Sequence, residues 1–281
     1  MRRFGDWVRL TDPHSQDEVK EFQEKVMNWW AENTRDLPWR RDPSPYNVLV
    51  SEIMLQQTQV SRVAPKFNEF IEIFPTTESL ANANSKDLLK VWSGLGYNRR
   101  AIWLKEAAKQ IFERGEFPQT VKELENLKGV GPYTSRSVLI FAFNRDLAAV
   151  DTNIRRVLIA SGFADESMSD IKLQPIADKV LLRGRSRDWH NALMDYGAQV
   201  MTSSSTGIAP TSKQTCFEGS SRQVRGAAIR VLTEVTELGL GELMLLLDCD
   251  LDESELKSIM FQLMDDGLVE MAGDSIYRIA K

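Results

Sequence analysis

The chain has 281 residues, of which 42% are hydrophobic and 27% are charged, a composition typical of a folded protein with a buried core. It contains no run of about 18 uncharged apolar residues and no apolar segment behind Arg2 and Arg3, so we expect a cytoplasmic protein with no membrane partner and no signal peptide. The net charge of −5 excludes little, because DNA binding needs a local basic surface rather than a basic average.

Apolar residues recur at helical spacing through most of the first 201 residues. In the first such stretch, Val19, Phe22, Val26 and Trp30 follow one another at intervals of three or four residues. We expect helices over residues 17–30, 45–57, 65–73, 88–92, 99–114, 121–127, 133–143, 153–161, 173–182 and 189–201. Period-two alternation is absent before residue 220, so this part of the chain is predicted to be all-α.

One of the most apolar of these expected helices contains an acidic residue. Glu52 lies in the segment Val-Ser-Glu-Ile-Met-Leu, so a helix here would be largely buried. A buried carboxylate is costly unless it is paired or used, and burial favours the protonated form that a general acid needs. The alternative is a structural glutamate neutralised by a buried arginine such as Arg35 or Arg40. The segment by itself leaves both interpretations open.

A glycine-rich hairpin follows near the middle of the chain. In the pattern L-x-G-V-G-x-Y-T, one helix is expected to end at Gly129 and the next to begin just after Gly131, with Val130 packed between them. Backbone amides at the start of the second helix would then form an anion site for a DNA phosphate. An ordinary helix–turn–helix connector would explain GxG alone, but the longer pattern, with Tyr133 eighteen residues before Asp151, favours DNA binding.

Asp151 follows an apolar run and opens an expected helix. A residue in this position is commonly an N-cap, and the segment read by itself favours that structural role. A chemical role for Asp151 depends on its occurrence together with Glu52 and the hairpin.

After residue 201 the composition changes. Residues 202–221 are rich in serine and threonine and are predicted to be a linker. Residues 222–281 are expected to form helices over 222–238, 241–247 and 253–265, followed by strands at 268–271 and 275–279, an order typical of a winged-helix domain. The third of these helices often binds DNA, but here it is acidic, so we favour packing or a protein partner for this domain. Its charged residues are Asp252, Glu253, Glu255, Asp265 and Asp266, against Lys257 alone.

The residues that commonly bind metals are few. Cys216 and Cys249 are the only cysteines, and two thiolates cannot hold a four-cysteine iron–sulfur cluster. The two histidines, His14 and His190, are not in a zinc-binding motif. We therefore expect no metal and no other cofactor.

Residues 15–201 resemble the helix-hairpin-helix base-excision glycosylases and, among these, the MutY-type adenine DNA glycosylases. The matching segments occur in the family's order, and the run Met-Leu-Gln-Gln-Thr after Glu52 is the most diagnostic of adenine glycosylases. The segments are residues 37–40, 51–60, 94–97, 129–134 and 150–153. The resemblance implies an all-α helix-hairpin-helix glycosylase fold over residues 1–201, with two helical subdomains and the active site between them, plus a small C-terminal winged-helix-like α+β domain.

The resemblance also implies catalytic roles. Glu52 would protonate adenine at N7, and Asp151 would stabilise the sugar cation by its charge or by transient covalent attachment, as in other two-carboxylate glycosidases. Tyr133 would form a hydrogen bond in the site, and Asn153 would order Asp151 or the attacking water. Bifunctional relatives have lysine in place of Tyr133, and a phenol cannot form a Schiff base, so we expect a monofunctional glycosylase without strong strand-nicking activity.

Further residues are implied to contact double-stranded DNA that contains a mispair. The hairpin residues Gly129, Val130, Gly131 and Thr134 would hold the backbone, Gln57 and Tyr97 would fill the gap left by the extruded base, and Thr58 would also contact the DNA. An isolated tyrosine such as Tyr97 is otherwise usually a half-buried packing residue. The base pocket would include Arg35, Leu37, Trp39, Arg40 and Asn191. Other basic residues could contact phosphates, although for any one of them a solvated surface charge is the favoured interpretation. They are Arg99, Arg100, Lys105, Arg183, Arg185 and Arg187.

The chain departs from the family pattern in three places. Met201 stands where the first iron–sulfur ligand belongs, the large domain that reads 8-oxoguanine in long members is absent, and Asn191 replaces a usual Glu or Gln. Three hypotheses follow: a glycosylase for adenine opposite 8-oxoguanine or guanine, a thymine or uracil glycosylase for T·G or U·G mispairs, and a non-catalytic DNA-binding or regulatory protein. We expect a monomer.

Overall fold

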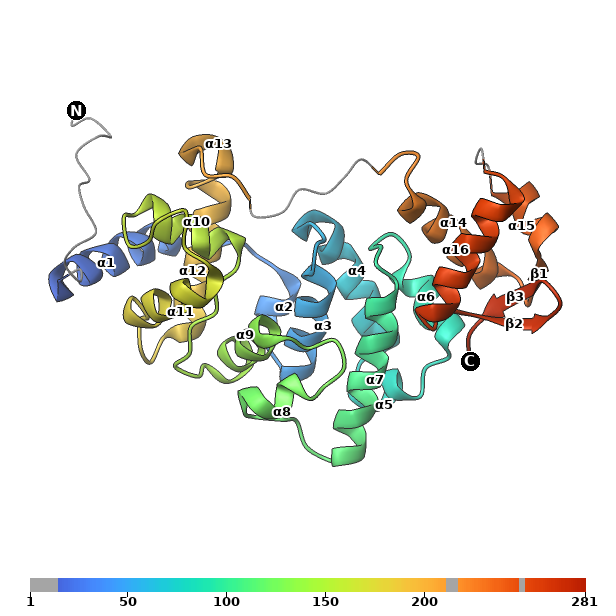
Figure 1. Cartoon of the computed structure of the whole chain (residues 1–281). Helices are drawn as coiled ribbons and strands as arrows, with labels where there is room; N and C mark the ends of the chain where they lie inside the picture. Colours follow the sequence, from blue (N-terminus) through green and yellow to red (C-terminus); the bar gives the residue numbers. More distant parts are fainter. Residues whose placement is uncertain (1–14, 211–216, 248–250) are drawn as a thin grey trace. The chain divides into compact units, whose positions relative to one another are not determined.

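The structure, a computed structural model, describes residues 15–210, 217–247 and 251–281. The chain separates into two compact units, each built from two stretches of sequence (Figure 1). The first unit comprises Met1–Asp36 and Pro132–Lys213, and the second comprises Leu37–Gly131 and Gln214–Lys281. The sequence predicted domain boundaries at residues 201 and 222, which divide the chain into consecutive segments. These boundaries stay predictions.

The first unit is helical. Its long first helix begins at a capping box, in which the Ser15 hydroxyl accepts from the Glu18 amide and the Glu18 carboxylate accepts from the Ser15 amide. Phe22 and Val26 of this helix pack against Trp189 and Val157 in one apolar core. The helices of this unit are α1 (Gln16–Asn33), α9 (Pro132–Phe143), α10 (Thr152–Ala160), α11 (Asp170–Lys179), α12 (Ser186–Gln199) and α13 (Ser203–Thr206).

The second unit contains a helical part and a small α+β part. The helical part comprises α2 (Pro38–Arg41), α3 (Pro45–Leu55), α4 (Val60–Ile73), α5 (Thr77–Ala81), α6 (Ser85–Trp92), α7 (Arg99–Arg114) and α8 (Val121–Glu125). The sequence predicted the start of α4 at Pro65, whereas the helix begins five residues earlier. The additional turn buries Val63 completely, and this burial outweighs the backbone hydrogen bond that Pro65 cannot donate.

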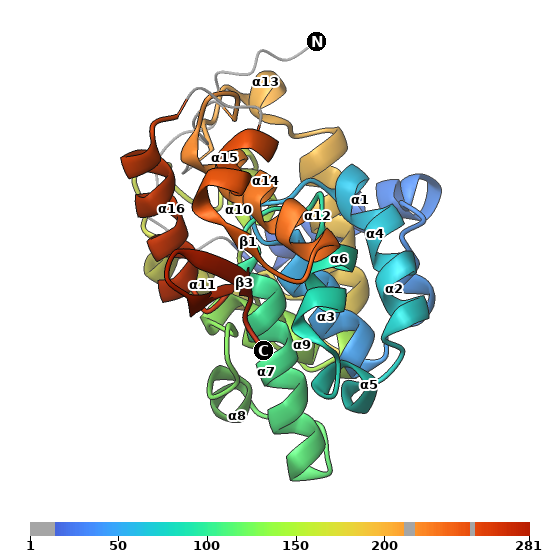
Figure 2. The ribbon, with the colours of Figure 1, turned by 90° about the vertical axis from the view of Figure 1, so that its right-hand side faces the viewer.

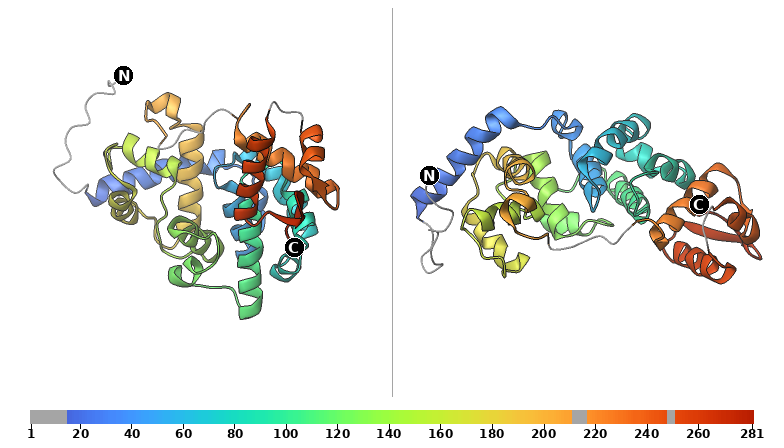
Figure 3. Two further views of the ribbon diagram at one scale, coloured as in Figure 1. Left: turned by 45° about the vertical axis from the view of Figure 1, so that its right-hand side comes forward. Right: turned by 90° about the horizontal axis from the view of Figure 1, so that it is seen from above.

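The small α+β part, residues 217–281, is called the C-terminal module here. It consists of α14 (Ser221–Glu234), β1 (Leu238–Gly239), α15 (Leu240–Leu246), α16 (Glu253–Asp265), β2 (Val269–Gly273) and β3 (Ile276–Ile279). The strands form an antiparallel sheet in the order β1-β3-β2, with Leu238 opposite Tyr277 and Val269 opposite Ile279. Helices α14 and α16 pack together beside this sheet (Figures 2 and 3). The order of elements is that of a winged helix.

The prediction of a helical chain with a small C-terminal α+β region is therefore confirmed. The sequence did not predict the short helices α2, α5 and α13, or strand β1. Helix α13 is a single turn capped by Thr202, and it lies in the segment that was expected to be linker. Elements of two to five residues are too short to show a hydrophobic period. Among the described residues, no helix is both long and apolar enough to cross a membrane.

Candidate active site

Asp151 caps helix α10 in the first unit. Its carboxylate accepts a hydrogen bond from the Ile154 amide at 2.7 Å and one from the Asn153 side-chain amide at 3.0 Å. The backbone at Asp151 is extended, as an N-cap requires. The structural role considered for Asp151 is therefore real, and any chemical role must coexist with it.

The same carboxylate lines a pocket of about 200 Å³ in the first unit. Tyr133, from α9, lines this pocket too, so the fold brings together two predicted site residues that lie eighteen positions apart in sequence. Burial raises the pKa of Asp151, although its hydrogen bonds to Ile154 and Asn153 act in the opposite direction. The sequence did not predict the remaining lining residues, which are Val150, Thr152, Arg155 and Asp170.

Asn153 is itself held by a buried arginine. Arg156 donates through one nitrogen to the Asn153 side-chain oxygen at 2.7 Å and to the Gly197 carbonyl at 2.9 Å. Its Nε donates to the Met201 carbonyl. A continuous series of hydrogen bonds therefore joins the end of α12 to Asp151. The predicted contact between Asn153 and Asp151 is present, whereas Arg156 was not identified from the sequence.

Gly197 lets α12 lie directly against the start of α10. A Cβ atom at this position would lie 2.9 Å from the Asn153 Cβ and 3.0 Å from the Asn153 carbonyl oxygen. Overpacking of this kind costs about 1–3 kcal/mol. Gly197→Ala is expected to lower the free energy of unfolding by about that amount, measured by urea denaturation, and to shift Asn153 away from Asp151.

Gly226→Ala is the matched control for this substitution. Gly226 lies inside α14, where an added Cβ would meet only the end of the Arg230 side chain, at 3.6 Å. Because alanine is the better helix former, this change should stabilise the protein by about 0.5–1 kcal/mol. A Gly197→Ala protein as stable as the wild type would contradict the packing argument.

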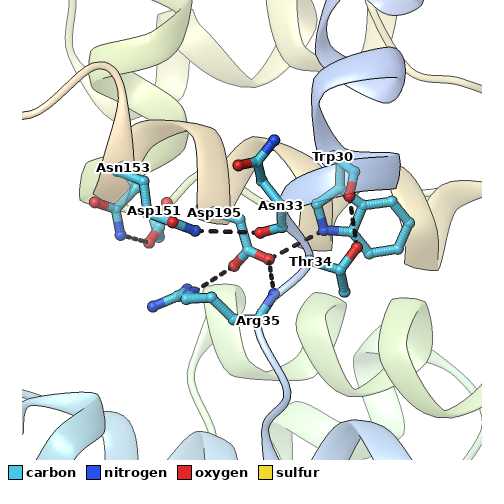
Figure 4. Close-up of polar contacts among 8 residues, drawn as sticks. Trp30, Asn33, Thr34, Arg35, Asp151, Asn153 and Asp195 are labelled. Carbon is cyan, nitrogen blue, oxygen red and sulfur yellow. Dashed lines mark hydrogen bonds and ion pairs between the residues drawn. The ribbon is translucent and has the colours of Figure 1, made fainter.

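A fully buried carboxylate fixes the segment that follows α1 (Figure 4). Asp195 of α12 is 0% exposed, and it accepts from the Trp30 indole at 3.0 Å and from the Arg35 backbone amide at 3.2 Å. The Arg35 Nε donates to its other oxygen at 2.6 Å. Arg35, predicted to line a base pocket, is thus ion-paired within its own unit. Asp195 was not identified from the sequence, although its apolar neighbours on α12 are the same signal that singled out Glu52.

His190 supports the chain just before Asp151. Its Nε2 accepts from the Ala149 amide at 3.1 Å, and in that tautomer its Nδ1 donates to the Ser186 carbonyl at 2.7 Å. The contact with the Ala149 amide requires the neutral ring, because a protonated imidazole has no acceptor nitrogen, and burial lowers the pKa of His190 to about 4.

This depressed pKa predicts a pH-dependent stability. The unfolded chain takes up a proton near pH 6.5 and the folded chain only near pH 4, so stability present above pH 6.5 is lost as the pH falls between these values. The slope should be about 1.4 kcal/mol per pH unit, or ~3 kcal/mol in all. Urea unfolding of His190→Gln, which keeps an acceptor for Ala149 but cannot be protonated, should lack this component. Parallel pH profiles for the two proteins would refute it.

In the second unit, Glu52 lies on the buried helix α3. Glu52 is 8% exposed, and every residue from Tyr46 to Met54 is buried. The expectation of a largely buried helix is therefore confirmed. Glu52 and Asp151 belong to different units.

Gln57 and Tyr97, the predicted wedge residues, both have left-handed backbone conformations, with φ of 54° and 48°. Such values are uncommon outside glycine and persist only where the surroundings impose them. Gln57 is exposed, and Tyr97 is 39% exposed, so both the wedge role and the partly buried packing role considered for Tyr97 stay open.

A single buried arginine holds the two loops that carry these residues. Arg100 is 5% exposed, and its guanidinium donates to oxygens on both loops. The acceptors are the carbonyls of Ile53, Met54, Gln56, Leu95 and Gly96 and the hydroxyl of Thr58. The interpretation of Arg100 as a phosphate ligand or a solvated charge is wrong, because its donors are used inside the protein.

The hairpin has part of the predicted local geometry: the turn at Gly129 and the helix start after Gly131 are present, whereas the preceding helix α8 ends at Glu125 and not at Gly129. Gly129 has a φ of 78°, and a Cβ there would lie 2.9 Å from the Trp103 Cβ, so only glycine fits. Val130 is buried, and α9 begins at Pro132 directly after Gly131. Thr134, predicted to contact DNA, is buried in α9.

The other predicted residues occupy varied positions. Leu37 and Trp39 are buried in the second unit, where Trp39 packs edge-on against Phe67 at 5.6 Å, while Arg40 and Asn191 are half-buried. Of the basic candidates, Arg99 pairs with Asp266, Arg185 pairs with Asp188, Lys105 donates to Ser85, Arg187 donates to Ala142, and Arg183 is exposed.

The donor set does not fit an iron–sulfur cluster. Both cysteines lie outside the described residues, and within residues 15–210, 217–247 and 251–281 no group of His, Cys, Asp or Glu could hold a metal. Met201, which the resemblance placed at the position of the first cluster ligand, packs against the core of the first unit.

Comparison with known proteins identifies the family. Residues 50–181 match the HhH-GPD superfamily base excision DNA repair protein family. Adenine DNA glycosylase of Mycolicibacterium smegmatis is 35% identical over 91% of this chain and 95% of that protein. Adenine DNA glycosylase of Homo sapiens is 36% identical over 66% of this chain and 37% of the human protein.

Solved structures agree with this assignment. A thermostable thymine-DNA glycosylase has a TM-score of 0.61 at 28% identity over 66% of this chain and 88% of that chain. Endonuclease III in a non-covalent DNA complex has a TM-score of 0.61 at 18% identity over 70% of this chain and 91% of that chain. At this identity the likeness concerns the fold alone. The predicted helix-hairpin-helix glycosylase fold is confirmed, and the chain belongs to the adenine DNA glycosylase family of the HhH-GPD superfamily.

Proposed function

We propose that this protein is a monofunctional DNA glycosylase of base excision repair that hydrolyses the N-glycosidic bond of adenine mispaired with 8-oxoguanine or guanine. The observation that carries the proposal is the pocket in the first unit, where Asp151 and Tyr133 line one cavity at the start of α10. Family membership supplies the substrate class, since the relatives that cover most of the chain are adenine DNA glycosylases.

The proposed chemistry needs two carboxyl groups with different protonation states. Glu52, on the buried helix α3, is the general acid that donates a proton to N7 of the extruded adenine, and the bond between C1′ and N9 then breaks with its electron pair leaving on the base. Asp151, ionised and held by Ile154 and Asn153, stabilises the positive charge on the sugar until water adds at C1′. Arg156 acts on this step only through Asn153 and is a positioning residue.

Strand cleavage is not part of the proposed reaction. A lyase needs an amine that attacks C1′, and among the described residues the pocket is lined by a phenol, a hydroxyl, a guanidinium and two carboxyls, with no lysine. We also propose that the protein works without an iron–sulfur cluster, acts as a monomer, and resides in the compartment that holds the DNA.

A base-release assay tests the proposal. Duplexes containing A·8-oxoguanine, A·G, T·G and U·G are incubated with the protein, and the strands are separated with and without alkali. The expected result is release of adenine alone, with strand breaks that appear only after alkali. Breaks without alkali would refute the monofunctional assignment.

Two other outcomes correspond to the competing hypotheses. Release of thymine or uracil would favour the second candidate substrate, which the 28% identity to a thymine-DNA glycosylase supports. Binding without release from any of the four duplexes would indicate a non-catalytic DNA-binding protein.

A further inference from the structure

The C-terminal module contacts the predicted wedge residue. At the start of α14, Arg222 donates a hydrogen bond through Nη1 to the Tyr97 hydroxyl at 3.2 Å. Both residues belong to the second unit. The other end of this helix is anchored on α6, where Lys90 pairs with Glu234 at 3.0 Å and Lys86 donates to the Val235 carbonyl at 3.0 Å. Helix α14 therefore has a fixed position beside Tyr97.

Charge is separated between two helices of the module. Helix α14 carries Arg222, Arg225 and Arg230 and a single acid, Glu234, at its end. Helix α16 with its caps carries five acids, and Lys257 is its only base. A phosphate backbone would be attracted to the first turns of α14 and repelled by α16.

Helix α16 is also occupied by contacts within the protein. Asp266, its C-cap, pairs with Arg99 of α7 at 3.0 Å and with Arg225 of α14. The third helix of this winged-helix arrangement, which commonly reads DNA, is thus acidic and is held by these ion pairs at its C-terminal end.

Tyr97 is presented in a defined conformation. Its backbone has a φ of 48°, and the Arg100 guanidinium, which fixes the loop, lies 5.5 Å from its ring centroid. A duplex that receives this ring carries a phosphate about every 3.4 Å along the axis on each strand, so phosphates pass close to the residues around the ring. Arg222 is a cation in direct contact with the hydroxyl of this ring.

From this arrangement we propose that Arg222 binds a phosphate of duplex DNA. Helix α14 then extends the DNA-binding surface from the helical part of the second unit onto the C-terminal module. The inference rests on the proposed function, because it takes DNA as the substrate and Tyr97 as the wedge. It assigns to α14 the role that the third helix has in other winged-helix proteins.

The test is the salt dependence of binding to a labelled, fully matched duplex, measured by fluorescence anisotropy on the full chain. A single phosphate contact contributes about 0.9 to the slope of log K against log salt. Arg222→Ala should therefore reduce the magnitude of the slope by about 0.9. Between 50 and 200 mM salt, the affinity of the variant should then fall about 3.5-fold less than the affinity of the wild type does. Lys257→Ala, which removes the only base of α16, is the matched control and should leave the slope unchanged.

A second pair of variants separates a direct contact from an effect through the tyrosine. Tyr97→Phe keeps the ring but removes the hydroxyl that accepts from Arg222. In this background Arg222→Ala should still lower the slope by about 0.9. Four results would overturn the inference. Three of them concern Arg222→Ala: an unchanged slope in the wild-type background, an unchanged slope in the Tyr97→Phe background, or tighter binding to DNA. The fourth is a reduced slope in Lys257→Ala.

Adenine release by the wild-type protein, measured on the same preparations, keeps the two proposals distinguishable. A wild type that releases adenine while Arg222→Ala keeps the full slope would refute the α14 contact alone. A wild type that neither binds nor cleaves any duplex would refute the proposed function and the inference together.

Discussion

Replacing Glu52 by glutamine should reduce adenine release by about 10²–10⁴-fold, which is the range that a positioned general acid contributes. Glutamine has nearly the same volume and can fill the same place on the buried helix α3, but it has no acidic proton for N7. Single-turnover release from an A·8-oxoguanine duplex measures the chemical step directly. DNA affinity, measured in parallel, should remain close to that of the wild type.

Glu69→Gln is a suitable control for this substitution. Glu69 is an exposed carboxylate on α4 in the same unit, and it pairs with Lys66 at the surface, at 2.8 Å. Surface pairs of this kind contribute about 0–1 kcal/mol, so this variant should keep full activity. A Glu52→Gln protein that retained more than about a tenth of the wild-type rate would show that Glu52 is a structural residue and not the general acid.

The parts of the site that the sequence predicted are those that local pattern determines. Apolar neighbours on both sides predicted a buried helix around Glu52, and the start of a helix after an apolar run predicted the N-cap at Asp151. The glycine spacing predicted the left-handed turn at Gly129. In each case the evidence lies within one turn of helix of the residue itself.

The residues that the sequence did not identify are buried charged or polar groups whose partners are distant in the chain. Arg100 binds carbonyls more than forty residues earlier, and Arg156 binds the carbonyl of Met201, 45 residues later. Along the sequence, a buried arginine looks the same as a solvated one. Only the packing of the helices shows that these guanidinium groups have carbonyls to bind, so periodicity could not separate them from surface charges such as Arg183.

These buried arginines also hold the segments that carry several of the predicted site residues. Tyr97 and Gln57 lie on loops with exposed side chains, and Asp151 is a half-buried residue at a helix end. In each case an interior guanidinium binds the backbone or side chain next to the predicted site residue. Such contacts can preorganise a site from inside the protein.

Asp151→Asn separates the two roles of this residue, because asparagine is as good an N-cap as aspartate. The new side-chain oxygen can still accept from the Ile154 amide, but its NH₂ group would face the Asn153 amide, whose oxygen is bound by Arg156. Since burial raises the pKa of Asp151, the folded state binds its proton more tightly than the unfolded state does. The charged form therefore costs stability once the pH exceeds that raised pKa, and Asn removes this cost.

The free energy of unfolding of Asp151→Asn at pH 7 should therefore fall by no more than about 1 kcal/mol, the value of one lost neutral hydrogen bond. Adenine release should fall by about 10²–10³-fold, because the developing sugar cation loses its opposing charge. Urea denaturation and single-turnover release on the same protein give both quantities. A substitution that lowered stability by several kcal/mol while leaving the rate of release intact would show that Asp151 serves the fold and that another group stabilises the cation.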